Sequence, residues 1–407
     1  MDVLILGGGA SGMMAALAAA ERGAQVTLVE RQSRLGRKLL ATGNGRCNLS
    51  NLHTEPAHYH GANPDFCRAA LEAFGAAETL AWFRRLGLIT AAEASGRVYP
   101  FSNQANSVLD VLRFALERPE IQIHTGCEAI RLWTRRDGFL LKTTGGDFTA
   151  RRLIVAAGGA AGGKLGGTTA GYEFLERLGH RRTPLFPALV QLVTEGAVTR
   201  ALKGVRAEGT VAVLRGGQEI ARSAGELQFT EYGVSGPAVF DISRIVSTGG
   251  PGLTLRLDLT PQLSESELLD ILRAKRAQLP QRAAGDLLTG VVHNRLGRVL
   301  VKTVGIAEST SMEILSDSQL AAVARAVKGF SLTCAGTQGM DCAQVTAGGI
   351  ETHGFDPMTL ESHRVPGVFA CGEVLDVDGD CGGFNLQWAW SSGRLAGLSA
   401  AGEEARP

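Results

Sequence analysis

The stretch that decides the fold is DVLILGGGASG, residues 2–12. Its four consecutive apolar residues predict a short buried strand, the glycines predict a tight turn, and the alanine-rich run over about residues 11–22 predicts a helix. A second strand is expected over residues 25–30. A strand, a glycine turn, a helix and a second strand in this order predict the start of a Rossmann-type α/β domain.

The glycine turn has the G-x-G-x-x-G spacing of a dinucleotide-binding motif. The first glycine permits the turn, the second lets a pyrophosphate approach the backbone, and the third lets the helix pack closely on the strand. The start of the helix offers free N–H groups and the positive end of its dipole to phosphates. The acid that ends the second strand can accept hydrogen bonds from the adenosine ribose. The residues expected to bind the dinucleotide here are Gly7, Gly9, Ala10, Ser11, Gly12 and Glu30.

A polar, glycine-punctuated loop follows at residues 37–48, RKLLATGNGRCN. Its cations could neutralise a pyrophosphate, and its glycines would let the loop press flat against an aromatic ring. We expect cofactor contacts from Arg37, Lys38, Gly43, Gly45 and Arg46.

The composition is that of a globular protein and excludes several function classes. The 407 residues suggest two or three domains, and glycine is high at 53 residues. With 41 Lys and Arg against 40 Asp and Glu, the chain is not a polyelectrolyte binder as a whole. Seven cysteines without a C-x-x-C pair give no disulfide or zinc framework, so a cytoplasmic location is expected, and no metal site is expected. No stretch is long and apolar enough to span a bilayer, so no membrane partner is expected.

A second glycine cluster lies near the C-terminus. Gly372 and Glu373 follow a strand, and residues 379–385 open the last helix, expected over residues 383–401. A helix N-terminus aimed at a flavin would stabilise negative charge on the reduced ring, and Glu373 could hold the ribityl hydroxyls. Together with the N-terminal motif, this cluster points to non-covalent FAD rather than NAD as the resident dinucleotide. Further expected cofactor contacts are Ala129, Gly158, Gly372, Glu373, Gly383, Phe384 and Asn385.

These motifs resemble those of a known family, the aminoacetone-oxidase-like, BaiN-like bacterial flavoproteins. The resemblance rests on residues 36–48, on GE at 225 with GVSGP at 233–237, on TAGGI at 346–350, and on GEVLDVDG at 372–379 running into GFNLQWAWSSG at 383–393. Phe384 stands where many relatives carry Tyr. The resemblance implies FAD in a Rossmann-like domain with an inserted β-barrel and a small helical domain. Members of this family have been linked to amines, unsaturated steroid acids and a uracil in ribosomal RNA.

The expected fold class is α/β, with three parts. Residues 1–186 and 344–407 form the FAD-binding Rossmann-like domain, residues 187–262 and 329–343 a β-rich, barrel-like insertion, and residues 263–328 a small helical domain. Within the first part, residues 67–86 and 106–118 are expected to be helical. Capping-box patterns at Ser264 and Ser316 predict helix starts in the third part.

The chemistry expected is hydride transfer through flavin N5, so the protein need only place the substrate and offer a proton. Arg46, Asn48 and Tyr99 are the catalytic candidates. The sequence favours an NAD(P)H-driven reductase of an activated C=C in a small molecule, with NAD(P)H as a transient donor because only one complete dinucleotide motif is present. The alternatives are a flavin amine oxidase using oxygen, a flavin-dependent uracil reductase acting on ribosomal RNA, and a non-enzymatic flavin-binding protein.

A basic segment bears on the choice between these partners. Residues 273–302 hold seven basic side chains against one acidic side chain, Asp286, for a net charge of +6. Such a face could bind RNA phosphates, or it could be an ordinary solvated surface. No aromatic residues interleave the charges to stack bases, so a small-molecule substrate is favoured over nucleic acid. The pattern gives no oligomeric state.

Overall fold

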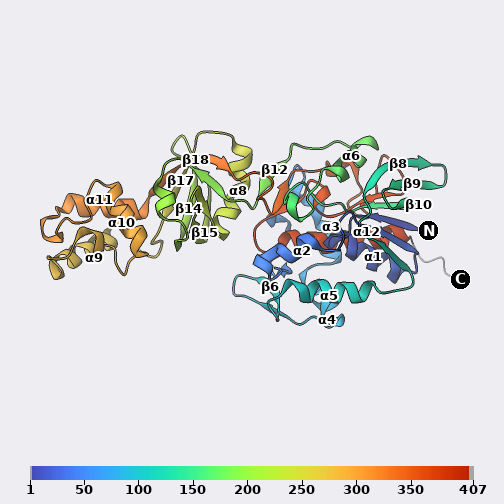
Figure 1. Cartoon of the computed structure of the whole chain (residues 1–407), viewed down its shortest axis with the longest axis horizontal. Coiled ribbons are helices and arrows are strands. Elements are labelled where there is room, and N and C mark those ends of the chain that lie inside the picture. Colours follow the sequence, from blue (N-terminus) through green and yellow to red (C-terminus); the bar gives the residue numbers. More distant parts are fainter. Residues whose placement is uncertain (1, 403–407) are drawn as a thin grey trace. The chain divides into compact units, whose positions relative to one another are not determined.

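The structure, a computed structural model, describes residues 2–402 and divides into two compact units. One unit consists of residues 2–186 and 344–402, and the other is Pro187–Ala343. Figure 1 traces the elements of both units along the chain.

The first unit is built around a parallel five-stranded sheet in the order β20-β11-β1-β2-β7. Its strands are β1 (Val3–Leu6), β2 (Val26–Val29), β7 (Ile121–His124), β11 (Arg152–Val155) and β20 (Val368–Ala370). All four residues of β1 and of β2 are buried, as expected for central strands of a parallel sheet that is covered on both faces. The order places β1 between its sequence neighbour β2 and the distant β11, which is the reversal point of a doubly wound sheet.

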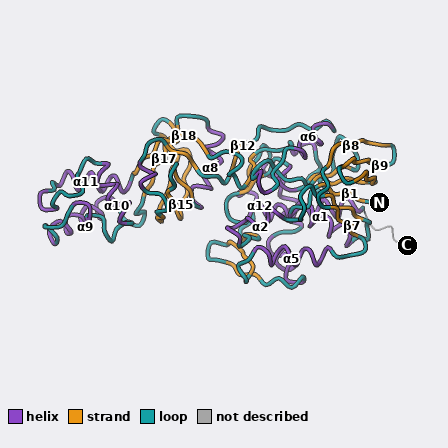
Figure 2. The backbone as a smooth tube through the Cα atoms, in the orientation of Figure 1, coloured by secondary structure: helices purple, strands orange, loops and turns teal. Residues whose placement is uncertain are grey.

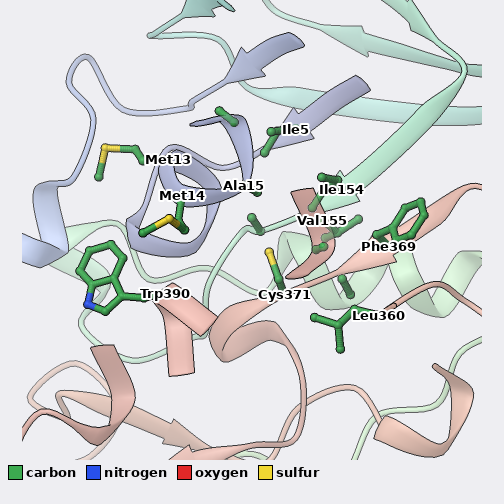
Figure 3. Close-up of a cluster of buried hydrophobic side chains, with 14 of the residues drawn as sticks. Ile5, Met13, Met14, Ala15, Ile154, Val155, Leu360, Phe369, Cys371 and Trp390 are labelled. Carbon is green, nitrogen blue, oxygen red and sulfur yellow. The ribbon is translucent and has the colours of Figure 1, made fainter. Parts of the chain in front are cut away.

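Helix α1 (Ala10–Glu21) packs against the last helix, α12 (Phe384–Ala401), although the two are far apart in sequence. Two glycines of α12 allow this: a Cβ at Gly393 would lie 2.4 Å from the Ser11 carbonyl oxygen, and one at Gly397 would lie 2.3 Å from that of Ala15. Figure 3 shows side chains of α1, the sheet strands and α12 meeting in the buried core. Residues drawn there include Met13, Met14, Ile154, Val155, Phe369 and Trp390.

Smaller elements surround this core. The remaining helices of the first unit are α2 (Arg37–Ala41), α3 (Arg68–Ala73), α4 (Ala76–Arg85), α5 (Ala105–Leu116) and α6 (Ala170–Arg177). Its minor sheets are β3 (Ser50–Asn51), β6 (Arg97–Pro100) and β5 (Thr90–Ala92); β8 (Ala129–Arg135), β9 (Gly138–Thr143) and β10 (Gly146–Ala150); and β4 (Tyr59–His60) with β21 (Asp378–Gly379). Strands β12 (Phe186–Ala188) and β19 (Val345–Ala347) flank the points where the chain passes between the units.

One expected helix is interrupted. The helical pattern over residues 67–86 continues across Phe74 and Gly75, but the chain leaves the helical conformation there and α3 and α4 are separate. Gly75 is in an extended conformation, and its N–H donates to Glu78 Oε2 at 3.1 Å, which starts a new helix. Apolar periodicity runs through such a break because both helices bury the same side.

The second unit contains a closed barrel in the order β13-β16-β15-β14-β17-β18. Its strands are β13 (Leu192–Thr194), β14 (Arg206–Arg215), β15 (Gln218–Phe229), β16 (Gly233–Ser235), β17 (Leu253–Asp258) and β18 (Phe330–Thr337). Two helices, α7 (Val198–Ala201) and α8 (Pro237–Gly249), also lie in the stretch expected to be β-rich. The pattern did not predict α8, where Pro237 at the first helical turn begins a 13-residue helix.

Three further helices of this unit gather at one end of the barrel, as Figure 2 shows by colour. They are α9 (Glu265–Gln278), α10 (Asn294–Thr303) and α11 (Asp317–Lys328). The Ser264 and Ser316 side chains accept hydrogen bonds from the third residue of α9 and of α11, so both predicted capping boxes are confirmed. The expected class, a Rossmann-type α/β domain with a barrel and helices, is confirmed. Over the described residues, no helix has the length and hydropathy needed to cross a membrane.

Adding one methyl group where α1 meets α12 should destabilise the protein. Gly397→Ala would gain up to about 1 kcal/mol of helix propensity, but its Cβ would overlap the Ala15 carbonyl and cost roughly 1–3 kcal/mol through forced helix separation. We expect a net fall in the midpoint of urea unfolding. Ser399→Ala, in the same helix and partly exposed, is the matched control and should leave the midpoint nearly unchanged. A Gly397→Ala variant as stable as the control would show that the helices have room to separate without cost.

Candidate cofactor and active site

Three adjacent strands of the central sheet end in glycine turns at the same edge. Gly7 follows β1, Gly158 follows β11 after two residues, and Gly372 follows β20 after Cys371. All three glycines have positive φ, at 111°, 73° and 74°. In doubly wound sheets, ligands bind at the carboxyl edge, at the strand where the order reverses. The candidate site is therefore built around the end of β1.

The dinucleotide motif has the geometry that its spacing predicts. A Cβ at Gly12 would lie 1.9 Å from the Gly7 carbonyl oxygen, so this position demands close packing of the helix on the turn. A Cβ at Gly9 would meet no atom within 4 Å, so the space beside the second glycine is open. In the described chain no side chain caps α1, which leaves its first N–H groups available to an anion. An open second glycine before an uncapped helix fits a bound pyrophosphate.

Glu30 lies beside this turn, as expected, and its carboxylate also accepts two backbone hydrogen bonds. Its Oε2 accepts from Gly8 N at 2.7 Å and its Oε1 accepts from Gln32 N at 2.6 Å. Each carboxylate oxygen has a second lone pair, so ribose hydroxyls could still donate to it. The segment before Ala129 is hydrogen-bonded to the residue after β2, because Cys127 N donates to the Glu30 carbonyl at 2.9 Å.

Two of the expected cofactor residues form an ion pair across the site. Lys38 Nζ lies 2.7 Å from Glu373 Oε2, and both side chains are largely buried. Glu373 Oε1 accepts from Thr346 N at 2.9 Å, which fixes the carboxylate beside the turn that follows β11. Arg37, in contrast, is exposed and donates to Gln32 Oε1 at 2.8 Å. The structure thus brings Lys38 and Glu373 together and leaves Arg37 at the rim.

Arg46 and Tyr99, two of the catalytic candidates, lie against each other. The Arg46 guanidinium is 3.9 Å from the centroid of the Tyr99 ring, and it approaches Glu93 Oε1 at 3.4 Å. Burial raises the pKa of Tyr99, while the nearby Arg46 acts in the opposite direction. Tyr99 therefore stays a neutral hydroxyl near neutral pH, able to donate a hydrogen bond.

Asn48, the third candidate, is committed to the backbone. With its amide nitrogen toward Ser50, the side chain donates to the Ser50 carbonyl and accepts from Gly383 N, both at 3.2 Å. It therefore joins the loop after α2 to the start of α12. Asn48 therefore positions the loop, and its contact with Gly383 N brings the start of α12 next to that loop.

The C-terminal motif is largely architectural. Asn385 pairs both amide atoms with the backbone of Gly379, accepting at 2.9 Å and donating at 2.7 Å. Gln387 is fully buried and donates to the Phe74 carbonyl, while Trp390 Nε1 donates to the Leu49 carbonyl at 2.9 Å. These contacts fasten the first turns of α12 to distant segments. These hydrogen bonds give the polar side chains of the motif a structural role that needs no contact with a cofactor.

Cysteines near the site have no sign of redox activation. Burial raises the pKa of the Cys47 thiol to about 12, and that of Cys371 to about 12. Thiols held in this way are poor nucleophiles. All seven cysteines lie in the described residues, and none of them forms a disulfide.

The sequence did not reveal a cluster of two histidines and an aspartate at the start of α12. His58 Nδ1 lies 2.9 Å from Asp380 Oδ2, and His60 Nε2 lies 2.7 Å from Asp380 Oδ1. The only available signal was the alternation His-Tyr-His, which places both histidines on one face of a strand. Their partner lies more than 300 residues later in the chain.

The basic segment of the second unit is less charged than its window suggests. Asp270 and Asp317 pair with Arg273, Asp317 also pairs with Arg276, and Glu308 pairs with Lys302. All three acids lie outside residues 273–302. Over residues 263–328 there are nine basic and seven acidic side chains, so the net charge is +2. The +6 of residues 273–302 is thus partly offset, because the fold brings acids from outside this window onto it.

A parallel sheet with an open glycine turn, a carboxylate after the second strand and a glycine-started C-terminal helix defines a dinucleotide-binding flavoprotein of the Rossmann type. The family model for the HI0933-like protein Rossmann domain matches residues 1–399. The chain belongs to this family, and the expected FAD cofactor and FAD-dependent oxidoreductase activity are confirmed.

Curated relatives match over nearly the whole chain. The chain is 41% identical over 402 residues to the 3-dehydro-bile acid delta(4,6)-reductase of Clostridium scindens, with 98% of each chain covered. It is 30% identical over 394 residues to the ribosomal RNA dihydrouridine synthase of Escherichia coli, with 96% of each covered.

Solved structures share the fold at low identity. The quinol fumarate reductase FrdA chain of Escherichia coli aligns with a TM-score of 0.51 at 18% identity, covering 100% of this chain and 70% of that one. The 3-ketosteroid delta1-dehydrogenase of Sterolibacterium denitrificans aligns with a TM-score of 0.50 at 13% identity, covering 98% and 99%. These likenesses show the fold alone.

Removing the Glu30 carboxylate should weaken FAD binding. Glu30→Ala leaves Gly8 N without its acceptor and loosens the turn beside the pyrophosphate, at a cost of roughly 1–3 kcal/mol. Titration of the apoprotein with FAD, followed by flavin fluorescence, should show a dissociation constant raised by about 5- to 150-fold. Glu117→Ala, at an exposed acid after α5, is the control. Equal affinity in the two variants would mean that Glu30 does not support the cofactor.

Proposed function

We propose that this protein is an NAD(P)H-driven, FAD-dependent reductase of an activated C=C bond in a small molecule. The observation that carries the proposal is the 41% identity, over 98% of both chains, to a protein named as a reductase of a dehydro bile acid. A likeness at this level across the whole length includes every segment of the candidate site. When bound, FAD supplies the hydride that adds to the electron-poor carbon of the substrate.

The residues of the first unit support this role by binding and by orientation. The open turn at Gly9 and the uncapped start of α1 would hold the pyrophosphate, and Glu30 would accept from the ribose. The Lys38–Glu373 pair would lie along the middle of the cofactor, where Glu373 is held by Thr346 N. Tyr99 and Arg46 offer a neutral hydroxyl and a cation that could bind a carbonyl oxygen and so polarise the conjugated bond.

A cytoplasmic location is part of the proposal. None of the seven cysteines forms a disulfide, and three of them flank the candidate site, at positions 47, 371 and 381. Free thiols in these numbers are typical of a reducing compartment. Such a compartment would also provide NAD(P)H as the electron donor.

Anaerobic stopped-flow spectroscopy tests the proposed function. NADH or NADPH should bleach the flavin absorbance, and a 3-dehydro bile acid unsaturated at the 4 and 6 positions should restore it with formation of the saturated product. Bleaching by an amine, with peroxide formed on reoxidation in air, would establish an amine oxidase instead. A flavin that no donor reduces would leave only a flavin-binding protein.

The ribosomal RNA hypothesis remains the second candidate, because a relative 30% identical over the whole chain is named a ribosomal RNA dihydrouridine synthase. Among the described residues of the second unit, Arg282, in the loop after α9, and Arg298, in α10, are exposed and have no ion pair or side-chain hydrogen bond. Arg295 is different, because it donates to the Ala201 and Lys203 carbonyls. Only the unpaired arginines are therefore suited to a test of polyanion binding.

Changing Arg282 and Arg298 together to Gln should leave turnover of the small enone within about twofold, because exposed, unpaired charges contribute little to folding. The thermal midpoint and flavin spectrum should also be unchanged. As a control, Arg273→Gln breaks the pairs with Asp270 and Asp317 and should lower stability slightly. If the double variant instead lost affinity for ribosomal RNA and uracil reduction, with a salt slope reduced by about 2, the RNA hypothesis would replace the small-molecule one.

A further inference from the structure

The cluster of His58, Asp380 and His60 is unused by the function described above. The histidines flank Tyr59 in β4, and Asp380 directly follows β21, the strand that pairs with β4. The ladder is held further by Asp380 N, which donates to the His58 carbonyl at 3.0 Å. Both carboxylate oxygens are occupied by imidazoles, so the aspartate fixes the orientation of each ring.

Each ring keeps one nitrogen free for chemistry. His58 uses Nδ1 toward Asp380 and His60 uses Nε2, and in the described chain neither His58 Nε2 nor His60 Nδ1 has a hydrogen-bond partner. The two imidazoles are about one third exposed, at 37% and 36%. A carboxylate-oriented imidazole with its other nitrogen free is the usual arrangement of a protein proton donor or acceptor.

His58 is the member nearest the start of α12. Its ring stacks on Phe384, the first residue of that helix, with centroids 4.4 Å apart and planes inclined by 21°. Phe384 is held in turn by Tyr59, whose hydroxyl donates to the Phe384 carbonyl at 3.1 Å. The glycine loop that starts α12 is one of the segments we assign to the flavin site, so the stacked His58 ring lies beside a segment of that site.

The hydrogen bonds within the cluster keep the Asp380 carboxylate ionised. Burial alone would raise the pKa of Asp380, but the hydrogen bonds from His60 and His58 outweigh it and lower that pKa. Burial raises the pKa of both Tyr59 and Cys67, which pack behind the ladder, so these groups remain neutral.

Other ionisable groups face the cluster from the same strands and from β6. Asp378 is opposite His60 in the ladder, and Asp376 Oδ2 accepts from Ala62 N at 3.0 Å. Arg97 in β6 brings a cation to the same loop, because its Nε would lie 3.2 Å from a Cβ at Gly382.

We propose that His58 is the proton donor of the reductive reaction and that Asp380 is its positioning residue. The inference rests on the proposed function, because reduction of an activated C=C needs a proton as well as a hydride. When bound, reduced FAD would supply a hydride to the β carbon of the substrate, and the π electrons would pass to the α carbon. The Nε2–H bond of the His58 imidazolium breaks, its proton bonds to the α carbon, and the imidazole is left neutral with its Nδ1–H on Asp380. Solvent then returns the proton, since the ring is partly exposed.

His58→Asn is the most informative variant. The Asn amide nitrogen can replace Nδ1 in the contact with Asp380. The hydrogen bond between the two strands is then kept, while the Nε2 proton is lost. In anaerobic stopped flow, flavin reduction by NAD(P)H should be unchanged, and reoxidation by the enone should be about 10²-fold slower. The wild-type reoxidation rate should fall as the pH rises and the imidazolium is lost, whereas the rate of the variant should not vary with pH.

His60→Gln is the matched control. The Gln amide can replace Nε2 toward Asp380, and this variant should retain reoxidation within about fivefold of the wild type and a pH-dependent rate. If His58→Asn reoxidised as fast as the wild type with the same pH profile, the inference would be wrong while the proposed function stood. If the wild type itself were not reoxidised by any enone, the proposed function would fail first.

A cavity variant separates catalysis from folding. Should His58→Asn lose FAD, His58→Gly can be supplied with free imidazole during reoxidation. Restoration of the rate by imidazole, in proportion to its protonated fraction, would support the proposal. A variant that binds FAD and is not restored by imidazole would overturn it, as would a variant without flavin whose fold is lost, since His58 would then be a structural residue.

Discussion

The candidate site depends on how closely the backbone of α1 approaches its neighbours. The helix can start directly beneath the end of β1 only because position 12 has no side chain, where a Cβ would lie 1.9 Å from the Gly7 carbonyl. The same helix accepts α12 on its other side because Gly393 lies against the Ser11 backbone. Close packing on two sides fixes the position of the uncapped helix start. Because the helix start is fixed, its backbone N–H groups can bind an anion without a free-energy cost of reorganisation.

The C-terminal motif extends this constraint to the rest of the site. Gln387, Trp388 and Trp390 send their polar atoms to backbone groups of other segments, at Phe74, Gly372 and Leu49. Each of these atoms is buried, so an unsatisfied partner would cost about 1–3 kcal/mol. The first turns of α12 are therefore fixed by hydrogen bonds to three separate segments. The glycine loop that precedes them is fixed at its end by the same contacts. A scaffold fixed in this way can bind one cofactor while the residues at its rim vary with the substrate.

The sequence predicted the parts of this structure that depend on local pattern. The glycine motif, the acid after the second strand, both capping boxes and the last helix were read from residues close together in the chain. The break at Phe74 and Gly75 was missed because the apolar pattern is the same in α3 and α4, and α8 was missed because alternation and turn signals dominate its surroundings. The basic segment was misjudged because Asp317 and Glu308 reach it only after the helices fold.

The site residues divide in the same way. Lys38 and Glu373 were each predicted from their own motif, but nothing in either motif required that they form an ion pair. Asn48 was predicted to be catalytic because it is polar and follows the glycine loop, whereas its amide is used by the backbone. His58 and Asp380 were missed, since a contact across more than 300 residues leaves no spacing to recognise. Local sequence predicts where the cofactor binds, and long-range pairing decides which side chains remain free for chemistry.

Two charged assemblies therefore occupy the candidate site, and they differ in what they can do during a reaction. The Lys38–Glu373 pair is a direct contact of 2.7 Å between a cation and a carboxylate, and it can orient a cofactor. In the cluster at Asp380, the carboxylate is held ionised by two imidazoles, and imidazole is the side chain that exchanges a proton near neutral pH. Reducing a C=C bond consumes one proton for each hydride. On the proposal that His58 donates this proton, the cluster supplies it, whereas burial raises the pKa of Cys47, Cys371 and Tyr59 and keeps these three groups protonated.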